Sequence, residues 1–333
     1  MPLQRVNIMS LNMFLLAISE GLMWGLMALG VYLTFRILNF ADLTVEGSVV
    51  LGMAVALRLI TAGFNPLMAT LVAVIAGMAA GLITGFFHTV LKIPPLLSGI
   101  LTMTGLWSIN LRVIGTGALI TVPPGSYDTL MSRSVLLGNF TTFIAELFGG
   151  NQAQITRRAD ILAMIVVGLI FVTIVIVLLK LFFNTEIGYA IRATGDNEPM
   201  VKAQGINTNL VKLFGLALGN GCVALAGALV AQAQRNMNID MGVGAIVIGL
   251  AAVIIGEVFF RDKNNHRVFI AVVFGGILFF IIRAFVLNLG FININDFRLI
   301  SALILGFVLA LPMFRDKFSI QFKKLTTNAK RGG

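Results

Sequence analysis

The sequence has little charge. Asp, Glu, Lys and Arg make up 11% of its 333 residues, hydrophobic residues make up 58%, and the mean hydropathy is +0.97. In soluble domains roughly a quarter of the residues are charged, so this chain has too little charge to cover a surface that faces water. A membrane-spanning helix needs about 20 apolar residues. The composition therefore predicts a single all-α integral membrane domain over 1–333, with about eight to ten spans.

Motifs for catalysis and metal binding are also missing. No Gly-x-x-x-x-Gly-Lys-Ser/Thr loop occurs, so we expect any ATP and its Mg to be bound on a separate subunit, and this chain to be non-catalytic with no cofactor of its own. His88 and His266 lack a Cys or carboxylate at ligand spacing, which argues against a metal site. No nucleophile triad or carboxylate pair stands out, so an intramembrane enzyme is disfavoured. The single cysteine, Cys222, can form no disulfide within the chain and indicates no compartment.

The net charge of +10 does not indicate a nucleic-acid partner. Basic residues lie mainly between apolar runs and in the tail 315–333, a placement typical of membrane orientation. Met1–Ser10 has one basic residue and is followed by no small-residue cleavage site at a plausible distance. We therefore expect the first apolar run to be a span and not a removed signal.

Apolar runs predict nine crossings, with one more or one fewer possible. Each run is bounded by charged or turn-forming residues. The runs lie at about 11–35, 44–60, 66–91, 96–115, 160–183, 210–233, 242–260, 267–288 and 299–314.

The distribution of Lys and Arg predicts the orientation. If the tail is cytoplasmic, 15 basic residues fall on the cytoplasmic side and 8 on the other. Cytoplasmic loops are enriched in Lys and Arg, so we expect the C-terminus on the cytoplasmic side of the lipid membrane. Nine crossings then place the N-terminus outside.

Two connections exceed the usual few residues. The extracytoplasmic loop 116–159 contains a mildly apolar stretch, Val135–Leu147, which can lie along the membrane interface. The cytoplasmic segment 184–209 is polar. Asp196 or Asn197 can cap a short helix in it, Glu198 and Pro199 suit the first turn, and Gly205 suits the end. This pattern predicts a helix of about two turns, with Met200, Val201 and Ala203 available to a partner, although an ordinary solvated connector remains an alternative.

Small residues recur at four-residue spacing, which lets helix backbones approach closely in lipid. These glycines either pack helices within one bundle or form a dimer interface. They are Gly21, Gly25, Gly77, Gly81, Gly85, Gly215 and Gly219.

A few polar residues interrupt the apolar runs and are candidates for a translocation path. Asn39, Asp42 and Glu46 gather between the first two spans, and ionisable groups at such depth usually face a bundle interior or a water-filled path. Asp42 can instead cap the following helix. Trp107 and Asn110 share one helix face and can line a path that accepts aromatic groups, although Trp near a span end is also a common interfacial anchor.

Two further charged residues have open roles. Glu257 can pair with Arg261 four residues on, or face the path. Arg283 lies within a span and can extend to the membrane surface or face the path.

Several segments resemble a known family. Arg192–Asn197, Ala203–Thr208 and the Gly/Ala-rich span that ends at Gln232 resemble the coupling segment of the branched-chain amino acid and ribose (sugar) ABC permease superfamily. Leu38–Ser48, Gly242–Glu257 and Asn293–Ile300 resemble its tryptophan/tyrosine-type branch. The resemblance covers about residues 20–313.

The resemblance implies a type II importer-like permease. In the bacterial inner membrane, two permease subunits, identical or paralogous, would form the path, and two ABC ATPase subunits would grip the coupling segments. An extracytoplasmic binding protein would deliver a small polar solute. An aromatic amino acid is the expectation from the resemblance, and branched-chain amino acids, sugars and nucleosides stay open. The residues that the resemblance assigns to ATPase coupling are Gly195, Asp196, Asn197, Glu198, Pro199, Met200, Lys202, Ala203 and Gly205.

Two other classes of function stay open. An ion-coupled secondary transporter would have broken helices in two inverted repeats and carboxylates near the midplane, whereas no clear repeat is visible and the carboxylates cluster near inner span ends. A channel or scaffold would leave the helix within 184–209 without a role.

Overall fold

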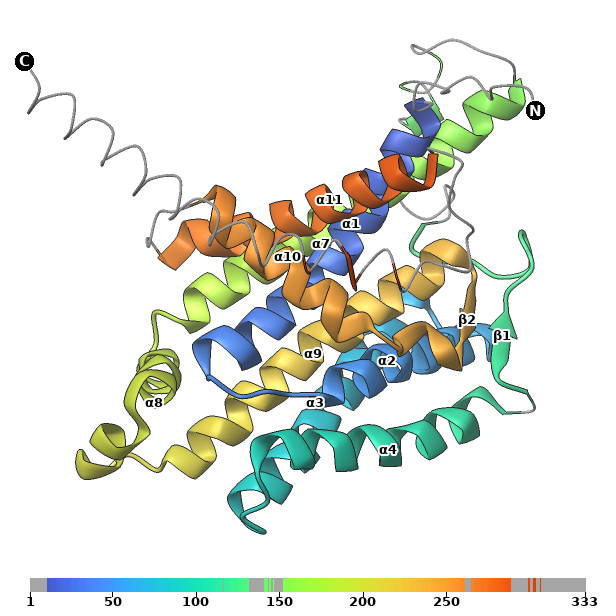
Figure 1. Cartoon of the computed structure of the whole chain (residues 1–333). Helices are drawn as coiled ribbons and strands as arrows, with labels where there is room; N and C mark the ends of the chain where they lie inside the picture. The colour runs from blue at the N-terminus through green and yellow to red at the C-terminus, as the bar shows by residue number, and fades with distance from the viewer. Residues whose placement is uncertain are drawn as a thin grey trace, which may run out of the picture.

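The computed structural model describes residues 11–115, 117–131, 141–142, 144, 146, 152–260, 265–288, 299, 302–303 and 306. Figure 1 shows long helices that run side by side, with short elements at their ends. The helices are α1 (Leu11–Val31), η1 (Tyr32–Ile37), α2 (Thr44–Thr61), α3 (Pro66–Thr89), α4 (Pro95–Ile114), α7 (Gln152–Phe182), α8 (Glu186–Ala203), α9 (Thr208–Gln234), η2 (Ile239–Gly242), α10 (Ala245–Phe259) and α11 (Asn265–Asn288); the strands are β1 (Leu119–Thr121) and β2 (Asn236–Asn238).

Eight helices in the described residues are long and apolar enough to span a membrane. They confirm eight of the nine predicted spans. The ninth, at 299–314, falls largely outside the described residues, as does Val135–Leu147, and the tail 315–333 falls wholly outside them.

The start of α7 differs from the sequence prediction. The helix begins at Gln152, although the apolar run begins only near 160. Its first turns are polar and helical, and the Arg158 guanidinium donates a hydrogen bond from Nε to Asn12 Oδ1 on α1 at 2.9 Å. The loop expected over 116–159 therefore ends before residue 152.

Local sequence explains where several spans begin. Asn65 accepts the Leu67 N–H at 2.8 Å and Pro66 occupies the first turn of α3. Pro95 begins α4, and Asn207 caps α9 by accepting the N–H groups of Asn209 and Leu210. Proline at the first helical turn and Asn at the cap satisfy a helix N-terminus at low cost.

Three helices form the core of the bundle. In α9, α1 and α2, 78%, 72% and 72% of the most apolar stretch is buried, whereas α4 and α7 each have 33% buried. Helix α9 packs against α3, α2 and α1, and α1 also packs against α11. Helices α4 and α7 therefore leave most of their apolar surface uncovered by the rest of the described chain.

Close approach between the core helices depends on glycine. A Cβ added at Gly81 of α3 would collide with the Leu216 carbonyl of α9, and one added at Gly21 of α1 would lie 2.6 Å from the Ile277 Cα of α11. The other four-spaced glycines also face helices or the Leu38 side chain of the same chain. This spacing therefore serves packing within one bundle.

The two ends of the bundle differ. At one end α8 lies across the ends of the long helices, and at the other a short ribbon joins the segments before α7 and after α9 (Figure 1). In this ribbon β1 pairs antiparallel with β2, with Ile120 opposite Met237. After this ribbon the chain continues into η2, which lies against the first turns of α2 and against the side chains of Met103 and Trp107 of α4.

Candidate functional site: a pocket beside α4 and a coupling helix

Between α1 and α2 the backbone is irregular but remains hydrogen-bonded. The end of α1 widens into the π-helical turn η1, and Asn39 has a left-handed conformation with φ of 52°. Asn and Asp adopt this conformation more readily than other non-glycine residues. The Phe40 N–H donates to the Thr34 carbonyl at 2.9 Å, so the chain turns back into α2 with its backbone groups bonded.

Asp42 is buried in a network that joins α2 to α9. Its Oδ1 accepts the Thr44 N–H at 2.9 Å, as expected of a residue that caps α2. Its Oδ2 accepts the side-chain amide of Asn220 at 2.7 Å, and Asn220 Oδ1 accepts the Ser48 hydroxyl at 2.7 Å. The side chain of Asp42 is 2% exposed. Asp42 therefore has a structural role: its partners, Thr44 and Asn220, do not line the pocket described below.

A second buried network connects three helices through threonine hydroxyls. Thr44 Oγ1 of α2 and Thr84 Oγ1 of α3 lie 2.6 Å apart, and the Thr84 hydroxyl donates to Thr102 Oγ1 of α4 at 2.9 Å. All three side chains are buried. Sequence analysis did not single out Thr84, Thr102 or Asn220, because small uncharged polar residues within apolar runs carry no signal of their partners in space.

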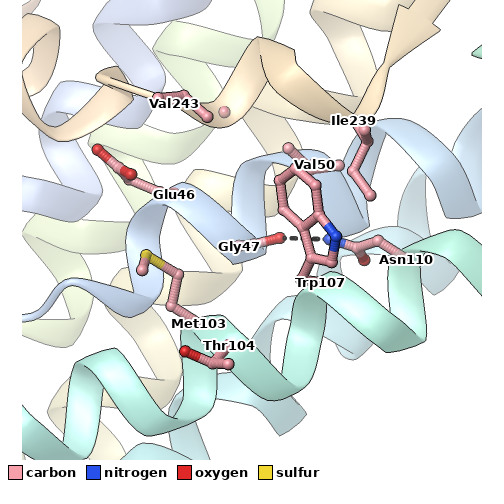
Figure 2. A pocket seen from close by; sticks show the side chains of 10 residues that line it. Glu46, Gly47, Val50, Met103, Thr104, Trp107, Asn110, Ile239 and Val243 are labelled. Atoms are coloured by element: carbon pink, nitrogen blue, oxygen red, sulfur yellow. Dashed lines mark hydrogen bonds between the residues drawn. The ribbon is translucent and has the colours of Figure 1, made fainter. Parts of the chain in front are cut away.

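Glu46, Trp107 and Asn110 converge on one pocket. It has a volume of about 210 Å³ and lies between α2, α4 and the η2–α10 connection. Figure 2 shows the Glu46 carboxyl at one end, Asn110 at the other, and the side chains of Met103, Thr104 and Trp107 along α4 between and below them. Three of the five predicted path residues are thus brought together.

Hydrogen bonds hold the two ends of this pocket. Asn110 is 1% exposed; its Nδ2 donates to the Gly47 carbonyl at 3.2 Å, and its Oδ1 has no hydrogen-bond partner among the described residues. Glu46 Oε1 accepts the Gly244 N–H at 3.0 Å. A Cβ at Gly242 would collide with the Glu46 carbonyl, so glycine there allows the η2 turn to lie directly on α2.

Asn39 does not reach this pocket. It lines a separate cavity of about 410 Å³ at the α8 end of the bundle, together with Phe40, His88 and residues 194–199 of α8. Its place among the path candidates is therefore not supported by proximity to Glu46.

The predicted helix within 184–209 is present, and Asn197 is its cap. Asn197 breaks α8 with φ of −155° and ψ of 86°, and its Oδ1 accepts the Met200 N–H at 3.1 Å. Glu198 and Pro199 form the first turn. Gly205 has φ of 83° and follows the end of the helix. We name residues 197–203 the coupling helix; its predicted role and its side of the membrane stay predictions.

The coupling helix presents some of the expected residues and buries others. Met200 is 47% exposed and Asp196, Lys202 and Ala203 are also exposed. Val201 is 0% exposed, so the expectation that it is available to a partner is wrong. Gly195 faces the bundle, because a Cβ there would collide with the Ile37 carbonyl. Gly195 and Val201 thus pack the helix against the bundle, and Met200 is exposed to a partner.

Glu198 links the coupling helix to the base of α9. Its carboxylate binds Lys202 and Lys212, each at 2.8 Å, and accepts the Thr208 hydroxyl at 3.1 Å. Burial alone would raise the pKa of this carboxyl, but the hydrogen bonds from Lys202, Lys212 and Thr208 and the charge of Lys212 lower its pKa to about 2. Glu198 therefore carries its charge at any physiological pH.

Lys212 extends this link toward α4. Its Nζ lies 3.1 Å from His88 Nε2 on α3, and His88 Nδ1 lies 2.8 Å from the Ile93 carbonyl in the α3–α4 turn. The His88 ring also packs edge-on against Phe40, with centroids 5.2 Å apart. His88 thus serves as a structural connection between the coupling helix, the α3–α4 turn and the loop before α2.

Glu257 and Arg283 have partners in other helices. The Arg36 guanidinium donates from Nε to Glu257 Oε1 at 2.7 Å, whereas Arg261, the partner expected from spacing, lies outside the described residues. Arg283 lies 3.6 Å from Glu20 of α1 and stacks over the Phe280 ring. Neither residue lines the Glu46 pocket.

The spanning helices, their buried polar networks and the pocket beside α4 define a multi-pass membrane protein of the permease class. Residues 13–311 match the family described as "Branched-chain amino acid transport system / permease component". The chain belongs to this family, and it is the permease component of an ABC-type transporter.

Three relatives show how the chain compares with individual proteins. It is 35% identical to the "Tyrosine transport system permease protein" of Clostridioides difficile strain R20291, over 94% of this chain and 93% of the relative. It is 31% identical to "Uncharacterized protein RP368" of Rickettsia prowazekii strain Madrid E, over 91% and 97%. It is 24% identical to the "Autoinducer 2 import system permease protein LsrC" of Yersinia pseudotuberculosis serotype O:3, over 76% and 64%. No solved structure gives a significant match.

Proposed function

We propose that this chain is the membrane-spanning subunit of an ATP-driven importer of a small polar solute, an amino acid with an aromatic side chain. A second permease subunit completes the path, separate ABC ATPase subunits bind ATP and Mg, and an extracytoplasmic binding protein delivers the solute. The bacterial inner membrane is the proposed location, with the coupling helix and C-terminus on the cytoplasmic side.

The coupling helix is the observation that carries this proposal. It is held rigidly by Gly195, Val201 and Glu198 against the long helices, yet it exposes Met200 at the end of the bundle. A partner that pushes on this helix moves α9 directly through Lys212 and the α3–α4 turn through His88. ATP binding to the ATPase can drive transport only if the nucleotide-bound ATPase binds one state of the bundle more tightly than the other. The contacts of the coupling helix with α9 and the α3–α4 turn would connect the ATPase to these states.

The path is proposed to run along the outward face of α4. Thr104, Ser108 and Arg112 are exposed there at four-residue spacing, which places them on one helix face. We name them the polar stripe of α4. The Glu46 pocket adjoins this stripe at Thr104, which also lines the pocket. Polar groups are costly in lipid, so this face suits a water-filled path that a second permease subunit completes.

The solute proposal has two supports. The relative from Clostridioides difficile is named for tyrosine transport, and the pocket beside α4 combines a carboxylate, an amide and the Trp107 ring. Aromatic side chains stack favourably against Trp, and cations bind its face.

Co-purification tests the central part of the proposal. The wild-type permease should retain an ATPase subunit, and Met200→Arg should release it by placing a charge at the contact. Ile187→Arg is the matched control, because Ile187 is also 47% exposed but lies before the kink in α8. If no ATPase accompanies the wild type, or if uptake persists without ATP, the proposal is wrong and ion-coupled transport is favoured.

A further inference from the structure

The pocket beside α4 contains a polar atom that the described residues leave unsatisfied. Asn110 is almost fully buried, and its Nδ2 is committed to the Gly47 carbonyl. This bond also fixes the orientation of the amide, because the reverse orientation would set two oxygens against each other. The remaining atom, Oδ1, is buried without a partner among the described residues. A buried acceptor without a donor is unfavourable, so this position favours a bound group that carries an O–H or N–H.

The opposite end of the pocket carries a carboxylate. Glu46 is less buried than Asn110 and lies away from it, with the side chains of Met103 and Trp107 placed along the space between them (Figure 2). The pocket therefore has a hydrogen-bond acceptor at each end and apolar or aromatic walls between. Its volume of about 210 Å³ is below the usual range for drug-sized ligands, and suits one small molecule or one large side chain.

These features define a class of ligand. The more buried end, at Asn110, offers a single neutral acceptor and suits a small donor such as a hydroxyl, whereas the less buried end, at Glu46, carries a carboxylate and suits a bulkier cationic head. We propose that the pocket binds an amino acid with a hydroxylated aromatic side chain: Glu46 binds the ammonium group, Trp107 contacts the ring, and Asn110 Oδ1 accepts the phenolic O–H. This inference rests on the proposed function and assigns specific contacts to its solute.

The assignment has a consequence for selectivity. A site that hydrogen-bonds a substrate hydroxyl discriminates against the analogue that lacks it, because the buried acceptor is then left unpaired. The pocket should therefore bind tyrosine more tightly than phenylalanine, and Asn110 should account for the difference.

Trp107 provides a direct readout of binding. The chain has two tryptophans, and the other, Trp24, is buried and stacked on Phe280. A Trp24→Phe variant therefore leaves Trp107 as the single indole. Its emission is measured in purified full-length permease in lipid nanodiscs during titration with tyrosine, phenylalanine or N-acetyltyrosinamide, which lacks the ammonium group. Excitation at the red edge of the indole band avoids the tyrosine ligand.

Two variants in this background separate the contacts. Asn110→Leu should weaken tyrosine binding about tenfold and leave phenylalanine binding unchanged, since one hydrogen bond to a neutral group is lost. Glu46→Gln should weaken tyrosine and phenylalanine by a similar factor of about ten and leave N-acetyltyrosinamide unchanged. The unchanged ligand in each case also shows that the variant is folded.

The same titrations can overturn the inference. It is wrong if Trp107 responds to none of the three probes, or if Asn110→Leu weakens tyrosine and phenylalanine equally, as expected of an acceptor that binds only water. The co-purification experiment is independent of this signal. An ATPase partner without a Trp107 response refutes the pocket alone, and a Trp107 response without an ATPase refutes the ATP-driven importer while the pocket assignment stands.

Discussion

Helices α4 and α7 both lie at the periphery of the protomer, and their most apolar stretches are buried to the same extent, 33%. Both expose aliphatic side chains, but the surface of α4 also exposes the polar stripe of Thr104, Ser108 and Arg112 beside Leu101 and Ile109. Among the eight spans of the described residues, α7 has the most hydrophobic stretch and α4 the least. The large exposed side chains along the membrane-spanning part of α7 are aliphatic: Leu169, Ile170, Ile174, Val177, Leu178 and Leu181.

The inner contacts of the two helices differ in the same direction. Helix α4 is attached through the Thr84–Thr102 hydrogen bond and the bond from Asn110 to the Gly47 carbonyl. Beyond the Arg158–Asn12 bond near its start, α7 packs with apolar side chains such as Val167 and Val172. Among the described residues, the Thr173 hydroxyl bonds within its own helix, to the Leu169 carbonyl at 2.7 Å. Equal exposure therefore does not mean an equal environment. The aliphatic face of α7 suits lipid, whereas the polar stripe of α4 suits water and a second subunit.

The largest expected difference in folding free energy is between a charge placed on the exposed face of α7 and the same charge placed on that of α4. Ile174→Asp inserts a carboxylate into the lipid-facing surface of α7 and should cost about 2.5–3.5 kcal/mol of insertion or folding free energy. Ser108→Asp places the same group on the polar stripe of α4 and should leave folding nearly unchanged. Yield of monodisperse protein and thermal unfolding in nanodiscs measure the difference. Equal loss for both variants would break the distinction between the faces.

A smaller difference in stability should follow from removing one threonine hydroxyl near each helix, because the hydroxyl near α4 bonds to neighbouring helices and the one on α7 bonds within its own. Thr84→Val removes the hydroxyl that bonds to Thr44 and Thr102, and should destabilise the bundle by about 2 kcal/mol because buried neighbours lose a partner. Thr173→Val on α7 is the matched control; it removes a hydroxyl bonded within its own helix and should change stability little. Amide hydrogen exchange should show the loss concentrated in α4. Equal exchange in both variants would contradict this account.

The smallest expected effect is the pH dependence of stability that arises from Glu198, which joins the coupling helix to Lys212 of α9. The pKa of Glu198 lies at about 2 in the folded chain against an ordinary value of 4.5. A group whose pKa is lowered by folding contributes stability above its unfolded pKa and loses it as pH falls through the folded value. The gap in unfolding temperature between wild type and Glu198→Gln should therefore be constant above about pH 5 and shrink toward about pH 2.

The control for this pH prediction is Glu186→Gln, at the exposed start of α8. This variant removes a carboxylate from the same helix, outside the network that Glu198 forms with Lys202 and Lys212. Partial exposure of Glu198 keeps the expected shift small. A gap for Glu198→Gln that widens on acidification would contradict the network of Lys202, Lys212 and Thr208.

Much of the fold follows from the sequence, because a membrane span has a simple signal. Apolar length and flanking charges gave eight spans close to their observed bounds, and cap chemistry predicted the helix after Asn197. The glycine pattern predicted close packing, although sequence alone left its partner open. The structure assigns it within the chain, for example Gly81 against Leu216.

The site was less predictable, because it depends on which residues meet in space. Glu46 and Trp107 are about 60 positions apart, and only the packing of α2 against α4 brings them together. Asn39 and Asp42 are close to Glu46 in sequence but face other partners, since the turn before α2 directs successive side chains to different sides. The Glu257–Arg36 pair likewise joins helices that no local spacing relates.

The most direct test of the contrast between α4 and α7 is the accessibility of single cysteines. Cys222 is the single native cysteine, so Cys222→Ala provides a background in which Ser108→Cys on α4 and Thr173→Cys on α7 can be compared. A charged, membrane-impermeant thiol reagent reacts with the thiolate, which forms in water and not in hydrocarbon. In the assembled transporter in membranes, the cysteine at 108 should react at least about tenfold faster than the one at 173, and both should react equally after denaturation. Equal rates in the native membrane, or faster reaction at 173, would contradict a water-filled path along α4.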